Sequence, residues 1–375
     1  MIYIDVSPAV HSRAGMGRYA ERVAAEVSKK REVTLFHNEG KGAFLPTTLT
    51  HLPSYKVKAG YKPWRMAVLL GQAAHFPMDR QLKGASIFHA TEHLLIPLKN
   101  IPTILTVHDI IPRLFPAYHK KLNYWYLNIA MPLYCRRATA VLTVSQSSKN
   151  DLVNYFELPA EKIHVIPEAA ADHFFQPTSD DIHRVTEKYN LPENYLLHLG
   201  TIEPRKNLHR LIDALLILRQ SHCDLKLVLV GAKGWLVDDL FERVKQERLE
   251  EIIILPGWVD DEDLPGLIAG ARLGVHPSLY EGFGLPILEQ MACGQVVASS
   301  NSSSLPEVGG EAAAYFDPTS VNEMVAVIHQ LLTSPDEYKK RQEMGLAQAK
   351  EFSWENSASK TIELYDLVRE QYAQR

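Results

Sequence analysis

The chain has 375 residues, of which 46% are hydrophobic and 22% charged, as in a soluble globular protein of two ordinary domains. Its formal net charge of −4 argues against bulk electrostatic binding to nucleic acid. We expect a cytoplasmic protein, because its three cysteines lack metal-ligand spacing, no secretory signal opens the chain, and no apolar run approaches the ~20 residues that span a bilayer.

Short apolar runs alternate with amphipathic stretches, which predicts βαβ units and parallel sheets. The expected strands of the first half are 1–6, 33–38, 86–90, 103–108, 140–145 and 162–167. Those of the second half are 195–200, 225–231, 252–257, 273–278, 296–300 and 312–317. Two sets of strands indicate an α/β chain with two doubly wound sheets. The polar, proline-bearing segment 171–183 suggests domains 1–172 and 173–353, followed by an amphipathic helix that starts near Ser353.

The segment RAGMGRYAERVAAEV (13–27) places Gly15 and Gly17 just before a predicted helix. Backbone N–H groups at such a helix start can bind phosphate. An ordinary tight turn is the alternative, because glycine occurs in most loops. Further on, TVHDIIP (106–112) puts His108 at the end of a buried strand, where a structural histidine is the alternative to a functional one.

The segment LGTIEPRKNL (199–208) follows the first strand of the second half. Asn207 is a suitable N-cap for the next helix. Arg205 and Lys206 should therefore lie in a loop at the carboxyl edge of the sheet, where open α/β folds bind ligands. A guanidinium beside an ammonium suits a diphosphate. A solvated basic loop is the alternative interpretation.

The run EGFGLPILE, residues 281–289, places two glutamates eight residues apart around a glycine-rich turn that opens a helix. Gly282 and Gly284 allow unusual backbone angles and a close approach of ligand, and Pro286 suits the first helical position. The helix start favours an anion. Glu289, one turn into the helix, can accept hydrogen bonds from a ribose diol beside that anion, while Glu281 can hold hydroxyls of a second polar group. These positions describe a nucleotide sugar.

EGFGLPILE resembles the signature of the family 4 retaining glycosyltransferases, and the similarity extends over nearly the whole chain. The resemblance implies the GT-B fold, in which two Rossmann-like domains face each other across a cleft and the C-terminal helix, about 354–375, returns to the first domain. The family pattern has a glycine after the sixth strand where this chain has Ala169, so we expect a stiffer hinge.

The resemblance also implies roles for individual residues. Arg205 and Lys206 would hold the donor diphosphate and stabilise the leaving nucleoside diphosphate, and His108 would lie near the reacting sugar. The other donor contacts would come from Gly15 and Gly17, from the loop at Trp258 and Val259 around the base, mostly through its backbone, and from Glu281, Gly282, Phe283, Gly284, Leu285 and Glu289. The first domain, with Gly15 to Gly17, His108 and the loop 91–97, would present the acceptor.

The acidic run Asp261-Glu262-Asp263 is similar to the metal-binding pair of the other major glycosyltransferase fold. We reject a metal site there, because a helix dipole favours acids near its start.

Segment 118–137 combines Lys120, Lys121 and Trp125 with other basic and aromatic residues. It suggests contact with an anionic membrane or a lipid-linked acceptor, and a helix with solvated basic ends is the alternative.

We therefore expect a metal-independent, retaining hexosyltransferase that needs no cofactor. Its donor would be UDP-glucose or GDP-mannose, and its acceptor a saccharide or lipid-linked saccharide in polysaccharide or cell-envelope biosynthesis. It would work in the cytoplasm, with peripheral membrane contact left open. A GT-B epimerase and a non-catalytic nucleotide-sugar binding protein are the alternatives; a phosphorylase would need a cofactor lysine pocket that the sequence does not indicate.

Overall fold

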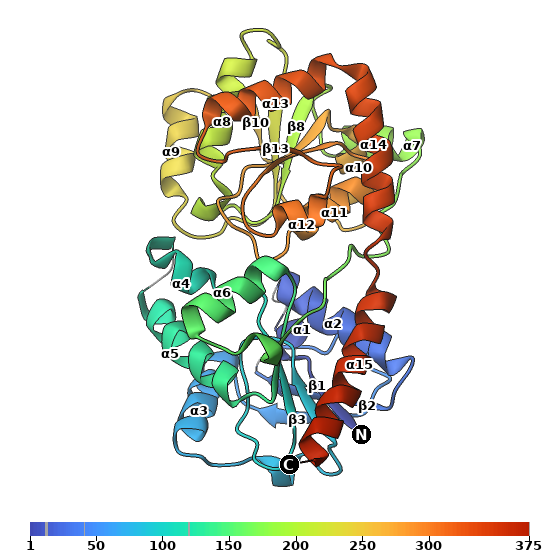
Figure 1. The fold of residues 1–375 in the computed structure, drawn as a ribbon. Coiled ribbons are helices and arrows are strands. Elements are labelled where there is room, and N and C mark those ends of the chain that lie inside the picture. The colour runs from blue at the N-terminus through green and yellow to red at the C-terminus, as the bar shows by residue number, and fades with distance from the viewer. Residues whose placement is uncertain (12–13, 41, 119–120, 375) are drawn as a thin grey trace. The chain divides into compact units, whose positions relative to one another are not determined.

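A computed structural model describes residues 1–11, 14–40, 42–118 and 121–374, and the chain forms two compact units of α/β structure (Figure 1). Unit 1 comprises Met1–Glu168 and the chain from Ser353 onward, and unit 2 comprises Ala169–Phe352. The acceptor-side and donor-side roles expected of the two domains stay predictions.

The sheet of unit 1 has seven parallel strands in the order β3-β2-β1-β4-β5-β6-β7. The strands are β1 Ile2–Asp5, β2 Val33–Glu39, β3 Ser54–Lys58, β4 Ile87–Ala90, β5 Thr103–Thr106, β6 Ala140–Thr143 and β7 Ile163–Val165. All except β3 are predicted from the sequence. The sequence analysis misses β3 because this edge strand is polar and no residue of it is fully buried.

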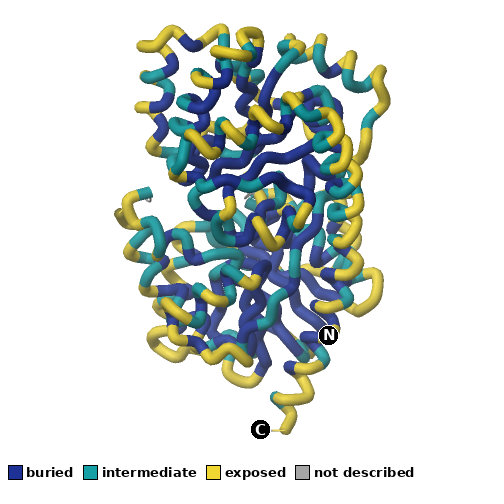
Figure 2. The backbone as a smooth tube through the Cα atoms, turned by 45° about the horizontal axis from the view of Figure 1, so that its top comes forward, coloured by how far each residue is buried: buried dark blue, intermediate teal, exposed yellow. Residues whose placement is uncertain are grey.

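Helices cover both faces of this sheet, so the residues of the central strands are buried on both sides (Figure 2). The helices of unit 1 are α1 Ser7–Val10, α2 Ala14–Ser28, α3 Tyr61–Ala73, α4 Ile111–Leu114, α5 Lys121–Arg137, α6 Gln146–Phe156 and α15 Trp354–Ala373. Ser353 caps α15 by accepting a hydrogen bond from the Asn356 amide, which confirms the predicted helix start. α15 packs on α2, and the ring of Trp354 lies 6.1 Å from that of Tyr19.

The sheet of unit 2 has six parallel strands in the order β10-β9-β8-β11-β12-β13. The strands are β8 Tyr195–Leu199, β9 Lys226–Val230, β10 Ile253–Ile254, β11 Leu273–His276, β12 Val297–Ser300 and β13 Ala314–Phe316, all within predicted segments. The helices are α7 Ser179–Lys188, α8 Leu208–Leu218, α9 Asp238–Gln246, α10 Leu264–Gly270, α11 Leu285–Ala292, α12 Leu305–Gly309, α13 Val321–Thr333 and α14 Pro335–Lys350.

Each sheet reverses its strand order once. In unit 2 the neighbours at the reversal are β8 and β11, and in unit 1 they are β1 and β4. The loops that leave such a strand pair run in opposite directions and open a crevice at the carboxyl edge of the sheet, where doubly wound folds bind ligands. The residues after β8 and β11, and after β1 and β4, are therefore the first places to look for a site.

Candidate functional site

Arg205 and Lys206 lie in a single 3₁₀ turn, Pro204–Lys206, between β8 and α8. Both residues are buried, with 9% and 6% of their surface exposed. The alternative of a solvated basic loop is therefore wrong. Asn207 stands at the N-cap position of α8, but its side chain makes no cap. Its amide nitrogen donates instead to the Pro277 and Pro318 carbonyls, because Asn207 has left-handed backbone angles and its side chain turns toward those loops.

Both cations of this turn bind Glu281, which follows β11. Lys206 Nζ lies 2.6 Å from Glu281 Oε1, and an Arg205 guanidinium nitrogen lies 2.7 Å from Oε2. Arg205 also donates to the carboxylate of Glu203 and to the Tyr280 carbonyl. Two cations and two carboxylates thus meet where the loops after β8 and β11 converge. Arg205, Lys206 and Glu281 are predicted from the sequence. Glu203 is not, because its contact with Arg205 depends on the 3₁₀ turn that follows it.

The charge of Glu281 is set by these neighbours. Burial alone would raise the pKa of its carboxyl, but the charges of Arg205 and Lys206 and the hydrogen bond from Lys206 outweigh burial, so the pKa lies far below the usual range. Glu281 is therefore ionised at every physiological pH. The site as a whole presents a fixed anion between two fixed cations, and the Lys206 ammonium, which donates to Glu281, has further N–H groups that an anionic ligand can use.

The glycine-rich turn leads directly into α11. Gly284 has a φ of +117°, and a Cβ there would come within 2.9 Å of the Leu305 side chain, so the position requires glycine. The helix begins at Leu285, which places Pro286 at its second position rather than its first as predicted. Proline remains suitable there, because the first N–H groups of a helix have no intrahelical partner.

Two serines after β12 hold this turn in place. The Glu281 amide donates to Ser303 Oγ across 2.7 Å, and Ser304 Oγ donates to the Glu281 carbonyl across 2.9 Å. The backbone on both sides of Glu281 is therefore fixed by hydrogen bonds. A carboxylate held this firmly keeps the two cationic side chains in place before a ligand arrives. Ligand binding then loses less side-chain entropy.

The remaining predicted donor contacts of unit 2 are mostly buried. Gly282, Phe283 and Glu289 are buried, and Leu285 is half-buried. Val259 packs its side chain into the apolar core, so only its backbone could contact a nucleotide base, as the resemblance implies. The neighbouring Trp258 is 83% exposed. The burial of these residues does not show a contact with a donor, so their roles in donor binding stay predictions.

A pair of buried histidines lies behind Lys206, and the sequence analysis missed it. His198 on β8 hydrogen-bonds through Nδ1 to the Val275 carbonyl across 3.0 Å, so Nδ1 carries the proton and Nε2 a lone pair. Nε2 is buried and has no hydrogen-bond partner among the described residues. Burial first, and then the charges of His276 and Lys206, lower the pKa of His198 to about 3. His198 is therefore a neutral acceptor at the edge of the site.

The predicted phosphate-binding glycines of unit 1 lie elsewhere in their helix than expected. α2 begins at Ala14, so Gly15 and Gly17 lie within its first turn rather than before it, and Arg13 lies outside the described residues. Gly17 has a packing reason, because a Cβ there would lie 3.0 Å from the Pro8 carbonyl oxygen. Gly15 is exposed, with open space above it, and its proposed contact with donor stays a prediction.

His108 lies in the loop after β5 and uses both ring nitrogens. Nδ1 is 2.9 Å from Glu168 Oε1, and Nε2 is 3.1 Å from the Thr91 carbonyl. Both partners are acceptors in their usual charge states, so this geometry favours the protonated ring, which donates from both nitrogens. Burial favours the neutral ring, but Glu168, the Thr91 carbonyl and Asp109 together raise the pKa of His108. His108 is thus a buried cation without a spare lone pair, and its place near a donor sugar stays a prediction.

Two buried carboxyl groups lie at the strand-order reversal of unit 1: Asp5 is the last residue of β1, and Glu92 follows β4. Asp5 Oδ1 accepts a hydrogen bond from the Ser7 amide across 2.8 Å, while Oδ2 has no partner among the described residues. Burial, together with the charge of Glu92, raises the pKa of Asp5 to about 7 despite the Ser7 hydrogen bonds. Glu92 belongs to the predicted acceptor loop, but Asp5 was missed. Its position at the end of the first strand was the available signal.

Comparison with known proteins bears on this site. Residues 13–170 match the family described as "Glycosyltransferase Family 4", and residues 179–351 match "Glycosyl transferases group 1". The chain is 34% identical to the O-antigen chain mannosyltransferase B of Escherichia coli, over 98% of this chain and 100% of that protein. The chain belongs to the family 4 (group 1) glycosyltransferases. The sequence-based prediction of a retaining, nucleotide-sugar-dependent glycosyltransferase is thereby confirmed.

Two further relatives extend this comparison. The glycosyltransferase is 33% identical to the serotype-specific mannosyltransferase WbdA of E. coli over 72% of its length, which spans 34% of that longer protein. Its fold matches a sucrose-phosphate synthase from Thermosynechococcus elongatus with a TM-score of 0.78 at 19% identity, covering 100% of this chain and 99% of the other. This match confirms the predicted GT-B fold.

The acidic run of the glycosyltransferase is occupied by ion pairs. Asp263 binds Arg184 across 2.7 Å and Lys188 across 2.6 Å. Burial would raise the pKa of Asp263, but hydrogen bonds from Lys188, Arg184 and Tyr189 lower it to about 2. The run lies in the turn before α10, so the predicted location in a first helical turn is wrong by a few residues. Asp263 joins α7 to α10 and has a structural role.

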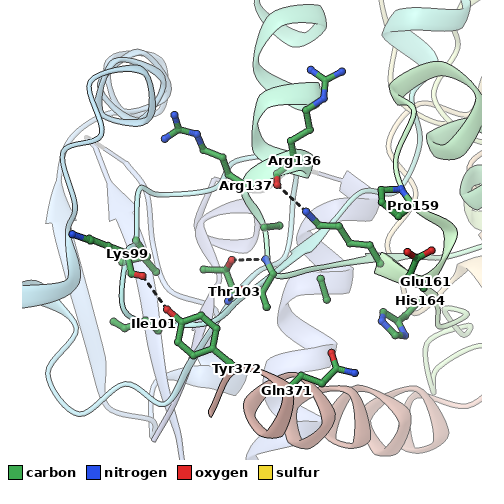
Figure 3. A pocket seen from close by; sticks show the side chains of 15 residues that line it. Lys99, Ile101, Thr103, Arg136, Arg137, Pro159, Glu161, His164, Gln371 and Tyr372 are labelled. Atoms are coloured by element: carbon green, nitrogen blue, oxygen red, sulfur yellow. Dashed lines mark hydrogen bonds between the residues drawn. The ribbon is translucent and has the colours of Figure 1, made fainter. Parts of the chain in front are cut away.

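A cavity of about 450 Å³ lies in unit 1 at the amino ends of β5, β6 and β7 (Figure 3). Its lining includes Arg136, Lys162 and Tyr372. Lys162 Nζ donates to the Arg136 carbonyl across 2.8 Å, and the Tyr372 hydroxyl donates to the Lys99 carbonyl across 2.9 Å. Lys162 thus supplies a hydrogen bond to a backbone carbonyl in the last turn of α5, where carbonyl groups have no partner within the helix. No predicted site residue lines this cavity, which lies at the edge of the sheet opposite to the one that binds ligands in such folds.

Proposed function

We propose that this glycosyltransferase transfers mannose from GDP-mannose to a saccharide or lipid-linked saccharide acceptor in polysaccharide biosynthesis. Two relatives that are 34% and 33% identical to it are named as mannosyltransferases, one an O-antigen chain mannosyltransferase and the other a serotype-specific mannosyltransferase. UDP-glucose is the second candidate donor, because few side chains of the site are free to read a nucleotide base. We place the reaction in the cytoplasm, at the inner face of the membrane, in agreement with three free cysteines.

The observation that carries the proposal is the pairing of Lys206 and Arg205 with Glu281 at the end of β8 and β11. The N–H groups of Lys206 that Glu281 does not use, together with the charge of Arg205 beside them, would bind the donor diphosphate. When the bond between the anomeric carbon and the phosphate oxygen breaks, negative charge grows on the departing nucleoside diphosphate. Fixed positive charge in a buried site lowers the energy of that transition state.

The other assignments follow from position. The start of α11 would face a phosphate oxygen, Glu289 would hold the ribose hydroxyls, and the backbone from Gly282 to Leu285 would line the donor sugar. The backbone at Val259 would contact the base. In unit 1, His108 and the first turn of α2 with Gly15 and Gly17 would act on the donor side, and loop 91–97 would present the acceptor. We expect neither metal nor cofactor to take part.

A thermal-shift panel of GDP, UDP, ADP and their common sugars, each with and without EDTA, tests the donor assignment. A ligand at ~100 times its dissociation constant adds about 2.7 kcal/mol of stability. We expect a shift with GDP and GDP-mannose that EDTA does not change. A shift with the UDP series alone would replace mannose by glucose, and a shift abolished by EDTA would contradict a metal-independent site.

Transfer itself needs a second measurement. Release of GDP from GDP-mannose should depend on an added mannan oligosaccharide, and the product should keep the configuration of the donor linkage. Donor binding without acceptor-dependent release of GDP would leave the binding site intact but overturn the acceptor class.

A further inference from the structure

Large apolar side chains are exposed on two helices of unit 1. On α5, Leu122, Trp125 and Ile129 are 85%, 63% and 59% exposed, and on α3, Met66 and Leu70 are 50% and 61% exposed. Their spacings of three and four residues place each set on one face of its helix. The opposite faces of both helices carry their buried core residues. We call these five residues the α3–α5 surface.

The two helices are direct neighbours, joined by Arg65 of α3. Its guanidinium carbon lies 4.0 Å from the ring centroid of Tyr126, and its nitrogens lie 3.4 Å from Asn123 Oδ1. The Tyr126 hydroxyl donates to the Arg65 carbonyl across 3.2 Å. In Figure 1, α3, α4 and α5 lie together along one flank of unit 1. The apolar stripes of α3 and α5 therefore lie side by side and face away from the core.

The chain segments that build this flank contain no acidic residue. Segments 40–78 and 110–150 hold neither Asp nor Glu, although the whole chain has 44 of them. The first segment carries five lysines and arginines and the second carries six. Lys62, Arg113 and Lys121 are exposed, and Lys120 lies outside the described residues. The three helices of this flank contribute the basic residues Lys62, Arg65, Arg113 and Lys121 and no Asp or Glu, on a chain whose net charge is −4.

The combination of exposed apolar side chains and basic residues on α3 and α5 indicates which kind of partner this surface binds. Exposed apolar patches mark interaction sites, but lysine is depleted from the cores of protein interfaces. Tryptophan beside leucine and isoleucine, bordered by basic residues, suits the boundary between lipid headgroups and acyl chains. We propose that the α3–α5 surface docks on an anionic lipid bilayer, with Leu122, Trp125 and Ile129 inserted among the acyl chains and Lys62 and Lys121 against lipid phosphates.

The binding is peripheral, because no described helix is long and apolar enough to cross a membrane. It would bring unit 1 to an acceptor that is carried on a lipid. No residue of the α3–α5 surface belongs to the proposed donor site, so vesicle binding and sugar transfer can fail separately. The proposal goes beyond the transferase activity and holds for either candidate donor.

Cosedimentation of the full chain with phosphatidylcholine vesicles, with and without phosphatidylglycerol, tests the proposal. We expect binding to the anionic vesicles and weak binding to the neutral ones. The double variant Leu122→Ser/Trp125→Ser should weaken binding to anionic vesicles at least about tenfold. Tyr155→Ser is the matched control, since Tyr155 is a 49% exposed aromatic residue on α6 of the same unit.

A second double variant tests the contribution of the basic residues to vesicle binding. Lys62→Glu/Lys121→Glu should weaken binding to anionic vesicles by about tenfold or more and leave the residual binding to neutral vesicles unchanged. Lys339→Glu/Lys340→Glu, a charge reversal of two exposed lysines on α14 of unit 2, should change neither. Equal binding of wild type to neutral and anionic vesicles would overturn the role of the basic residues.

A second readout excludes other occupants. Brominated lipids should quench the fluorescence of Trp125 in wild type, with quenching lost in the Trp125→Ser variant. Transfer to a water-soluble acceptor should be the same for wild type and for Leu122→Ser/Trp125→Ser. Absence of vesicle binding would overturn the proposal, as would a concentration-dependent dimer in analytical ultracentrifugation that Trp125→Ser abolishes, because a second copy of the chain would then cover the surface.

Discussion

Lys206 donates a hydrogen bond to Glu281, with 2.6 Å between Nζ and Oε1, where the loops after β8 and β11 converge. Both side chains are nearly inaccessible to solvent. Burying two charges costs solvation energy that their attraction only partly returns, so such a pair is weak evidence for stability. An alternative reason for its presence is function: Glu281 holds the ammonium in place for an anionic ligand.

Replacing Lys206 by methionine tests this reason. Lys206→Met keeps the length of the side chain and leaves Glu281 paired with Arg205, so the fold should persist. We expect kcat/KM to fall by about 10²–10³, mostly in kcat, because the lost charge acts on the departing diphosphate. Steady-state kinetics with the donor that binds best measure this, with Lys233→Met as an exposed control. A change in KM alone would contradict the role in the transition state.

Replacing His198 separates its two ring nitrogens. His198→Asn retains a donor toward the Val275 carbonyl but removes the acceptor that Nε2 presents near Lys206, whereas His198→Gln places an acceptor near the Nε2 position. A Cβ on Gly200 would lie 3.4 Å from Lys206 Nζ and 3.9 Å from His198 Nε2, so both nitrogens border the same small space. We expect kcat to fall about tenfold in His198→Asn and to recover partly in His198→Gln.

Thermal unfolding serves as the control for His198. The two variants should be destabilised to a similar extent, since each buries an amide in place of a ring. If activity merely followed stability in both variants, His198 would have only a packing role.

The His108–Glu168 pair should make the stability of unit 1 depend on pH. The pKa of His108 is raised in the folded protein, so its contribution is fully present below the unfolded pKa of about 6.5 and is lost as pH rises through the folded value. Glu168→Gln should lower this pKa and remove on the order of 2 kcal/mol near pH 6, and progressively less as pH rises through the folded pKa of His108. The His108 ring titration followed by NMR measures the shift.

Groups other than Glu168 also act on the His108 ring and could hide the effect of Glu168→Gln on its pKa. Asp109 and the Thr91 carbonyl also favour the imidazolium, burial disfavours it, and the ring of Tyr19 lies 4.7 Å away at a right angle. Glu161→Gln, at an exposed position of the same unit, is the control. An unchanged His108 titration in Glu168→Gln would show that these other groups set its charge.

Asp5→Asn should stabilise the protein at neutral and alkaline pH. The pKa of Asp5 is raised to about 7 by burial, whereas it ionises near 3.9 in the unfolded chain. Its ionisation therefore opposes folding increasingly from about pH 4 to pH 7, by on the order of 2–4 kcal/mol. Asparagine can keep the hydrogen bond to the Ser7 amide without the charge. A gain in Tm at pH 8 that is absent at pH 4 checks this.

The activity of Asp5→Asn tests whether the carboxyl group serves the acceptor. We expect the Asp5→Asn variant to have both a higher KM for the acceptor and a higher Tm than the wild type. A gain in stability with a loss of function is the usual sign that a destabilising residue serves function. Asp366→Asn, at an exposed position of α15, should alter neither quantity. Full activity in the stabilised Asp5→Asn variant would remove Asp5 from the acceptor site.

The sequence by itself determined the fold class, the family and the positions of the strongest chemical groups. Buried parallel strands are runs of apolar residues, so twelve strands could be read from hydrophobicity alone, and only the half-exposed edge strand β3 could not. The motif EGFGLPILE required particular residue types at fixed spacing, since Gly284 needs positive φ and proline suits a helix start. Such local requirements are visible in the chain.

Only the tertiary structure decided which charges meet. Lys206 and Glu281 are 75 positions apart in the sequence, and they pair because β8 and β11 are neighbours in the sheet. The same holds for the acceptors on both nitrogens of His108 and for the burial of Asp5, since burial and ionisation depend on segments distant in sequence. The residues of α5 are apolar on more than one face, so only its packing against the core decides which apolar face is exposed.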